Sequence, residues 1–197
     1  DTLLYTFTTT ANLSALGTFH LAVYTDLSCD ATLVNDTISK TVVNNPLVYC
    51  VSGATSTSYC DISNVSVSNI NNGNPLPVYS NPTCVATYTD YTSLAPGILL
   101  AGMTYPISVS QCNPSTTFGV SMANVYLDFN RNGIFDLPQE KIFSAPTSST
   151  ATTVSGVFTV PTTGIVTNNP TRMRVVLDYN DVANPCGTYT YGETEDY

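Results

Sequence analysis

The sequence predicts an all-β fold, an antiparallel β-sandwich of the jelly-roll or immunoglobulin-like kind with long, disulfide-stapled loops. Two observations predict the strands: apolar and polar residues alternate in many short runs, and Pro, Gly, Asn and Ser separate these runs. Residues with high helix propensity are scarce, and no long apolar stripe follows a 3.6-residue period. A chain of 197 residues can bury about 70% of its unfolded surface, so it has material for a real core.

The alternating runs fall into two groups along the chain. Residues 3–7, 19–24 and 37–43 form the first group, and about three strands cannot close a sandwich. We therefore interpret residues 1–45 as the last strands of a larger domain and residues 46–197 as the main sandwich. Alternatively, the early strands add a sheet to the following domain. The clearest later runs are 105–112, 124–129, 154–161 and 171–179, whereas residues 68–94 are rich in Asn, Pro and Ser and are expected to form a loop.

The charge balance limits the partners of the chain. Fourteen acidic and five basic residues give a net charge of −9, which disfavours nucleic acid and anionic membrane surfaces and favours divalent cations. No apolar run approaches the roughly 20 residues that cross a bilayer, so no membrane span is expected. The chain opens at Asp1 without a signal peptide, which suggests a mature or excised fragment.

The six cysteines predict disulfides and an oxidising compartment. They are widely spaced, form no CxxC pair and accompany a single histidine, so a zinc site is not expected. Buried, reduced thiols are the alternative. Sequence spacing alone leaves fifteen pairings open.

The stretch from Asp128 to Glu140 is predicted to bind calcium. Oxygen-bearing side chains recur at alternate positions and Gly133 is sixth, where a cation-binding loop turns sharply. The predicted ligands are Asp128, Asn130, Asn132, the carbonyl of Ile134, Asp136 and Glu140. Asparagine in place of aspartate lowers the charge of the ligands. It therefore predicts a weak calcium affinity, as in calcium-binding modules of extracellular proteins. The alternative is a plain Asn-Gly hairpin, or Asp and Asn side chains capping turns without a metal.

A second acidic cluster ends the sequence. We expect the strand with Arg172 and Arg174 to pair with the strand carrying Glu193 and Asp196, and one arginine to form a bidentate ion pair with either Glu193 or Asp196. The alternatives are a solvated acidic edge and a second calcium site.

No catalytic function is predicted. His20 is the only histidine, and no GxSxG or HExxH motif occurs. Glu193 and Glu195 could form a glycosidase-like carboxylate pair, although a structural role is simpler. The thirteen tyrosines could form a sugar-stacking platform, but tyrosine in a β protein is more often a half-buried strand residue.

The terminal motif "YGETEDY" resembles that of GEVED domains. The similarity extends back through "NPCGTY", "TRMRVVLDYN", "FTVP", "VYLDFNRNGIFDLPQE" and "YTDYTSL" to "YCVSGATSTSY". The resemblance implies a β-sandwich from secreted or cell-surface multidomain proteins, chiefly of Bacteroidota, and one further strand after the motif. An acidic loop also stands at the calcium position in that family. Residues 13–42 resemble the end of a bacterial immunoglobulin-like repeat.

The resemblance also orders the cysteines and suggests a modification. Related domains carry counterparts of Cys84 and Cys112, which we pair first, and Cys50 and Cys186 match the two ends of the family pattern. Cys29 and Cys60 remain and form the third expected pair. Thr2 and Thr37 lie in short Asp-Thr-apolar signals for O-glycosylation in these bacteria.

The expected function is a non-catalytic, structural or adhesive module outside the cell or on its surface, stabilised by calcium and disulfides. Its expected partners are neighbouring domains of the same polypeptide and, less directly, glycans or other surface molecules. The alternative is an accessory glycan- or substrate-binding module of a secreted hydrolase or protease.

Overall fold

The computed structural model describes residues 6–13, 15–26, 29, 32, 34, 36–56, 58–73, 86–112, 120–150, 152–179 and 184–197. The chain divides into two compact units, Asp1–Leu47 and Val48–Tyr197. This division lies two residues after the boundary expected from the sequence. The described residues contain no α-helix, and so none that could span a membrane.

The first unit holds one antiparallel pair of strands, β1 (Gly17–Tyr24) and β2 (Thr37–Asn44), in register from Gly17 opposite Asn44 to Tyr24 opposite Thr37. Most residues of both strands are exposed. A two-stranded sheet alone is marginally stable in water. Of the run expected at residues 3–7, the described residues 6 and 7 are not in a strand.

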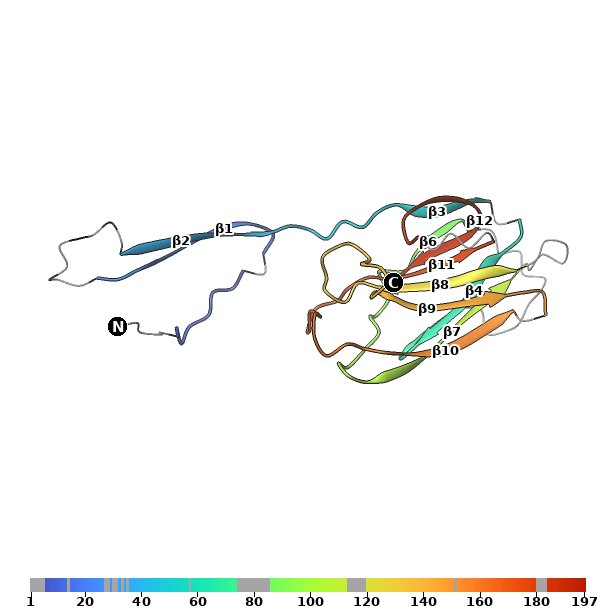
Figure 1. Ribbon diagram of the computed structural model, residues 1–197. Coiled ribbons are helices and arrows are strands. Elements are labelled where there is room, and N and C mark those ends of the chain that lie inside the picture. The colour runs from blue at the N-terminus through green and yellow to red at the C-terminus, as the bar shows by residue number, and fades with distance from the viewer. Residues whose placement is uncertain are drawn as a thin grey trace. The chain divides into compact units, whose positions relative to one another are not determined.

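The second unit, here called the sandwich unit, contains two packed sheets (Figure 1). The four-stranded sheet has the order β10-β7-β4-β5, from β4 (Asp61–Val67), β5 (Ile70–Gly73), β7 (Thr104–Cys112) and β10 (Thr153–Thr159). The other sheet has the order β3-β12-β11-β8-β9, from β3 (Ser52–Ser56), β8 (Ser121–Leu127), β9 (Lys141–Thr147), β11 (Met173–Asp178) and β12 (Gly187–Asp196). β6 (Tyr88–Asp90) pairs with β12 outside this order.

The core lies between the two sheets and follows from the two-residue period of the strands. Val65 and Val109 from one sheet, and Val125 and Val175 from the other, are fully buried in one apolar cluster. Side chains of successive residues point to opposite faces of a strand, so alternate apolar residues meet across the gap. The structure thus confirms an all-β sandwich.

The sequence predicted antiparallel strands throughout, but two strands pair with β12 in parallel. β3 and β6 both pair with β12 in parallel, β3 along its first half and β6 along its second half. The carbonyl of Thr87 accepts N–H bonds from both Ala54 and Thr194, which joins the two short strands to β12. The expectation of a continuous loop over residues 68–94 was also wrong, because β5 and β6 lie within it. Their few residues give too weak a periodic signal to distinguish them from loop.

Candidate functional site

The predicted calcium loop joins β8 to β9. The N–H of Leu127 donates to the carbonyl of Glu140 and closes the base, so residues 128–140 project as one wide loop. The two-residue Asn-Gly hairpin is therefore wrong. Gly133 adopts a φ of 84°, a left-handed conformation that side chains disfavour, which is the physical reason for glycine there.

Backbone donors surround the first carboxylate of the loop. Asp128 is fully buried and accepts N–H bonds from Asn132 at 3.2 Å and Gly133 at 2.9 Å. The hydroxyl of Tyr49 donates to the same carboxylate at 2.8 Å. Burial and the Asp128 carboxylate raise the pKa of Tyr49 to about 12, so this hydroxyl remains a donor at neutral pH.

Glu140, at the other end of the loop, also accepts hydrogen bonds from backbone N–H groups. Its Oε1 accepts N–H bonds from Phe129 at 2.8 Å and Asn130 at 3.3 Å, and its Oε2 accepts from Asp136 at 2.8 Å. Glu140 thus ties both ends of the loop together, as expected of a closing ligand, but through backbone amides. Asp128 and Glu140 are needed for the shape of the loop whether or not a cation binds.

The remaining predicted ligands converge on Asp136. The side-chain amides of Asn130 and Asn132 donate to its Oδ2 at 2.7 and 2.9 Å. The oxygens of these amides accept from the N–H groups of Asn132 and Ile134, respectively. Turn-capping without a metal, one of the two alternatives, accounts for every one of these bonds.

The charges of the loop are nevertheless unbalanced. Among the described residues, no arginine or lysine forms an ion pair with Asp128, Asp136 or Glu140. Burial raises the pKa of Glu140 and the nearby charge of Asp128 adds to it, although backbone N–H bonds oppose the shift. No three Asp, Glu, His or Cys side chains in the described part of the chain are arranged to hold a metal. A cation would therefore need oxygens from the asparagines as well as the carboxylates. Those donors are hard oxygens, the type that calcium prefers.

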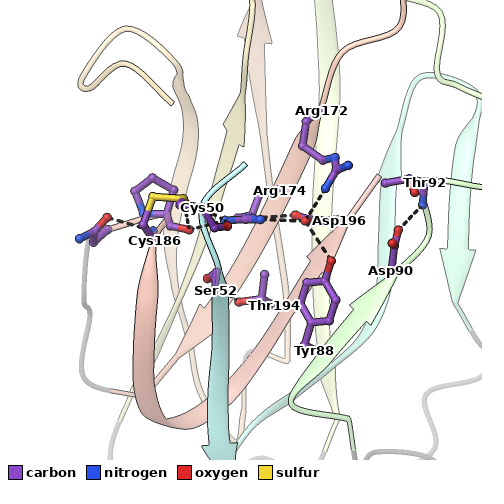
Figure 2. Close-up of polar contacts among 12 residues, drawn as sticks. Cys50, Ser52, Tyr88, Asp90, Thr92, Arg172, Arg174, Cys186, Thr194 and Asp196 are labelled. Atoms are coloured by element: carbon purple, nitrogen blue, oxygen red, sulfur yellow. Dashed lines mark hydrogen bonds and ion pairs between the residues drawn. A yellow bond between two sulfur atoms is a disulfide. The ribbon is translucent and has the colours of Figure 1, made fainter. Parts of the chain in front are cut away.

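The last strand carries the second predicted site (Figure 2). Arg174 of β11 stands opposite Asp196 of β12 and binds it through two hydrogen bonds, Nε to Oδ1 at 2.7 Å and an Nη to Oδ2 at 2.8 Å. Its other Nη donates to the carbonyls of Cys50 and Pro185 at 2.9 and 2.8 Å. Arg174 is 2% exposed, so the expected bidentate ion pair exists and is buried.

A second arginine, Arg172, connects these hydrogen bonds to the loop 128–140. Arg172 binds Oδ2 of Asp196 at 2.7 Å, and the hydroxyl of Tyr88 donates to the same oxygen at 3.2 Å. The guanidinium of Arg172 also lies 4.7 Å from the centre of the Tyr49 ring. Tyr49 therefore contacts both Arg172 and Asp128. No sequence pattern distinguishes Tyr49 from the other tyrosines of the chain, so this role could not be predicted.

Of the two acids that the sequence left open, the arginines bind Asp196 and not Glu193. Glu193 lies on the opposite face of β12, because residues 193 and 196 are three positions apart in a strand. Its carboxylate instead accepts bonds from the hydroxyl of Thr89 at 2.7 Å and the N–H of Ile62 at 3.0 Å. The exposed acidic edge is wrong, since Glu193, Glu195 and Asp196 are all buried.

One expected disulfide is present, between Cys50 and Cys186, 136 residues apart. Cys112 is disulfide-bonded, and Cys84, its expected partner, lies outside the described residues. The Cys29–Cys60 pair was wrong: both are free thiols, Cys29 exposed in the first unit and Cys60 buried in the sandwich core.

The remaining predictions fall on the surface or outside the described part. Thr37, the first residue of β2, is exposed, whereas Thr2 lies outside the described residues. Tyr59, Tyr179 and Tyr191 form a half-buried cluster with ring centres 4.4 to 6.2 Å apart. Two of the three ring pairs meet edge to face, unlike a flat sugar-stacking platform.

Comparison with known families identifies the second half of the sandwich unit. A family model described as GEVED domain matches residues 122–197. This stretch is a GEVED domain. The match begins within β8, so the GEVED domain contains the candidate calcium loop, the ion-paired Arg172 and Arg174, and all of β12. The resemblance of residues 49–121 lies outside the match. No curated protein and no solved structure matches the chain.

The GEVED domain depends on partners from the earlier half of the sandwich unit. Tyr49 and Cys50 contact the loop and Arg174, and Ile62 and Thr89 bind Glu193. In the motif itself, Gly192 has a φ of 135°, and a Cβ there would lie 1.8 Å from the carbonyl oxygen of Leu177. The glycine of the motif is thus required by close approach of β11.

Proposed function

We propose that this chain is a non-catalytic module of a secreted or cell-surface protein, structural or adhesive in role, whose GEVED domain binds calcium through the loop 128–140. The observation that carries the proposal is the buried, uncompensated negative charge of Asp128 and Glu140, within a loop of oxygen ligands. A divalent cation would offset this charge and order the loop.

A disulfide and a buried ion pair support a structural role over a catalytic one. The Cys50–Cys186 disulfide and Arg174 hold the beginning of the sandwich unit to its last strand. A disulfide of this kind is favoured by an oxidising environment, which supports location outside the cell. Neighbouring domains of the same polypeptide are the proposed partners. A glycan- or substrate-binding module is the alternative, and a glycan array with the full chain would reveal it by binding of a defined sugar.

Calcium is expected to bind the full chain with a Kd of about 0.1–1 mM and to raise its melting temperature. At 10 mM calcium, 10 to 100 times that Kd, the expected rise is about 3–10 °C relative to protein in a chelator. Isothermal titration calorimetry should show heat of binding under the same conditions. Absence of both heat and a melting shift at 10 mM calcium would contradict the proposal.

Asp136→Asn tests the ligand set without breaking the loop. Asp136 accepts only side-chain amide bonds at Oδ2, and the new amide can present its oxygen to them. We therefore expect a melting temperature near that of the wild type in chelator, but at least a tenfold weaker response to calcium. Asp90→Asn, which removes a carboxylate from β6, should leave the calcium response unchanged. An equal response in all three proteins would exclude this loop.

A further inference from the structure

A separate group of acids lies inside the sandwich, away from the calcium loop. Asp61 at the start of β4 and Glu193 and Glu195 of β12 are 1%, 3% and 5% exposed. In the described residues, both arginine ion pairs are formed with Asp196, whose side chain lies on the opposite face of β12 from Glu193. If all three carboxyls were ionised, three negative charges would be buried without a cation. That arrangement is strongly unfavourable in a low-dielectric interior.

The hydrogen bonds show which of the carboxyls can hold the charge. Glu193 is surrounded by donors: the Thr89 hydroxyl binds one of its oxygens, and the Ile62 N–H binds the other. Asp61 accepts the Ile62 N–H at Oδ1, at 2.9 Å, but its buried Oδ2 has no donor. The single N–H of Ile62 is shared by the two carboxyls, at 2.9 Å from Oδ1 of Asp61 and 3.0 Å from Oε2 of Glu193, which places them side by side. A proton on Oδ2 would satisfy this oxygen by making it a donor to Glu193.

We propose that the folded sandwich binds a proton between Asp61 and Glu193, carried by Asp61 and donated to the ionised Glu193. The site is a carboxyl–carboxylate pair, in which one negative charge is shared by two acids. It makes the folded state take up a proton that the unfolded chain would release near neutral pH. The domain thereby becomes more stable in mildly acidic than in mildly alkaline surroundings.

Burial and the neighbouring acids favour protonation of the cluster, although backbone hydrogen bonds from Ile62 and Ala86 to Asp61 oppose it. Burial raises the pKa of Asp61 well above its ordinary range, and the hydrogen bond and charge of Glu193 add to the shift. Burial and Glu193 raise the pKa of Glu195 as well, against a 2.7 Å bond from the Tyr197 hydroxyl. The other titratable groups that interact with the cluster are acids too: Cys60, Tyr91, Asp178, Tyr189 and Tyr197.

The sign of the pH dependence follows from the raised pKa values. The stabilisation is complete below the pKa of the unfolded carboxyls, about 4, and is lost as the pH rises towards the higher pKa of the folded state. Between pH 5 and pH 8.5, wild-type protein should therefore lose thermal stability. Glu140, whose pKa is also raised, contributes in the same direction. The test must therefore isolate Asp61 by comparing variants.

Asp61→Asn is the decisive variant, because an amide mimics the protonated acid and never needs a proton. In the full chain, with chelator present, its melting temperature should exceed that of the wild type. The difference should widen by about 3–5 °C for each pH unit between 5 and 8.5. The exposed control Asp26→Asn should give the wild-type pH profile. A constant or narrowing difference for Asp61→Asn would overturn the proposal.

Glu193→Gln tests which acid carries the proton. Glutamine would turn an amide donor towards Thr89, Ile62 or Asp61, so this variant should melt below the wild type at every pH. If Asp61→Asn melts below the wild type at every pH, the folded protein needs Asp61 as a charged group and the proposal is overturned. If both variants stabilise the protein equally, the acids repel each other without a shared proton, which also overturns the proposal. Should Glu193→Gln fail to fold, the pH profile of Asp61→Asn decides alone.

Discussion

Replacing Arg174 with alanine is expected to destabilise the sandwich unit by about 3–5 kcal/mol and to lower its melting temperature by about 10 °C. Arg174 binds Asp196 through two hydrogen bonds and the carbonyls of Cys50 and Pro185 through two more. The main cost is the buried Asp196 carboxylate, which keeps only Arg172 and the Tyr88 hydroxyl as partners. Thermal unfolding at pH 7 measures the change.

Arg172→Ala is the graded control for this prediction. The Arg172 side chain is 23% exposed and makes one bond to the same carboxylate, so its loss should cost about 1 kcal/mol or less. Arg174→Lys should lie between the two, since lysine keeps the charge but cannot form the planar, bidentate pair. A change of only a few degrees in Arg174→Ala would mean that Arg174 is not what holds β11 and β12 to the segment at Cys50.

Removing the Cys50–Cys186 disulfide with serine at both positions is expected to cost about 4–5 kcal/mol. In the chain-entropy model this figure follows from the length of chain that the bond closes, 136 residues, because the cross-link restricts the unfolded state. The carbonyls of Cys50 and Pro185 also hold Arg174, so a looser end should weaken the ion pair as well. Urea unfolding of the double variant provides the measurement.

Cys29→Ser is the matched control, because Cys29 is an exposed, free thiol. It should leave the urea midpoint unchanged. A loss below about 1 kcal/mol in the double variant would indicate that hydrogen bonds alone keep the segment at Cys50 in place. That outcome would shift the structural role from the covalent bond to Arg174.

Tyr49 links these predictions to the calcium proposal. It precedes the disulfide, donates to Asp128, and lies under the guanidinium of Arg172. Its ring also packs against Phe135 of the loop, with centres 5.5 Å apart. Tyr49 therefore joins the loop to the first residues of the sandwich unit.

The sequence by itself determined the fold class and most of the strands. Alternation in runs such as 105–112 and 171–179 was sufficient because one face of each strand must be buried, and a two-residue period leaves only one choice of face. An ion pair between an arginine of β11 and an acid of β12 was also predictable, because the chain has few arginines, but the sequence left open which residues form it. The span of the loop 128–140 followed from the spacing of its polar residues.

Only the tertiary structure decided the partners of β12. Glu193 and Asp196 lie close in sequence but on opposite faces, so one meets Asp61 and the other meets two arginines. The parallel strands β3 and β6, the free thiol of Cys60 and the role of Tyr49 depend on segments brought together from distant parts of the chain. Local sequence cannot predict such contacts, because burial and charge compensation are properties of the assembled sheets.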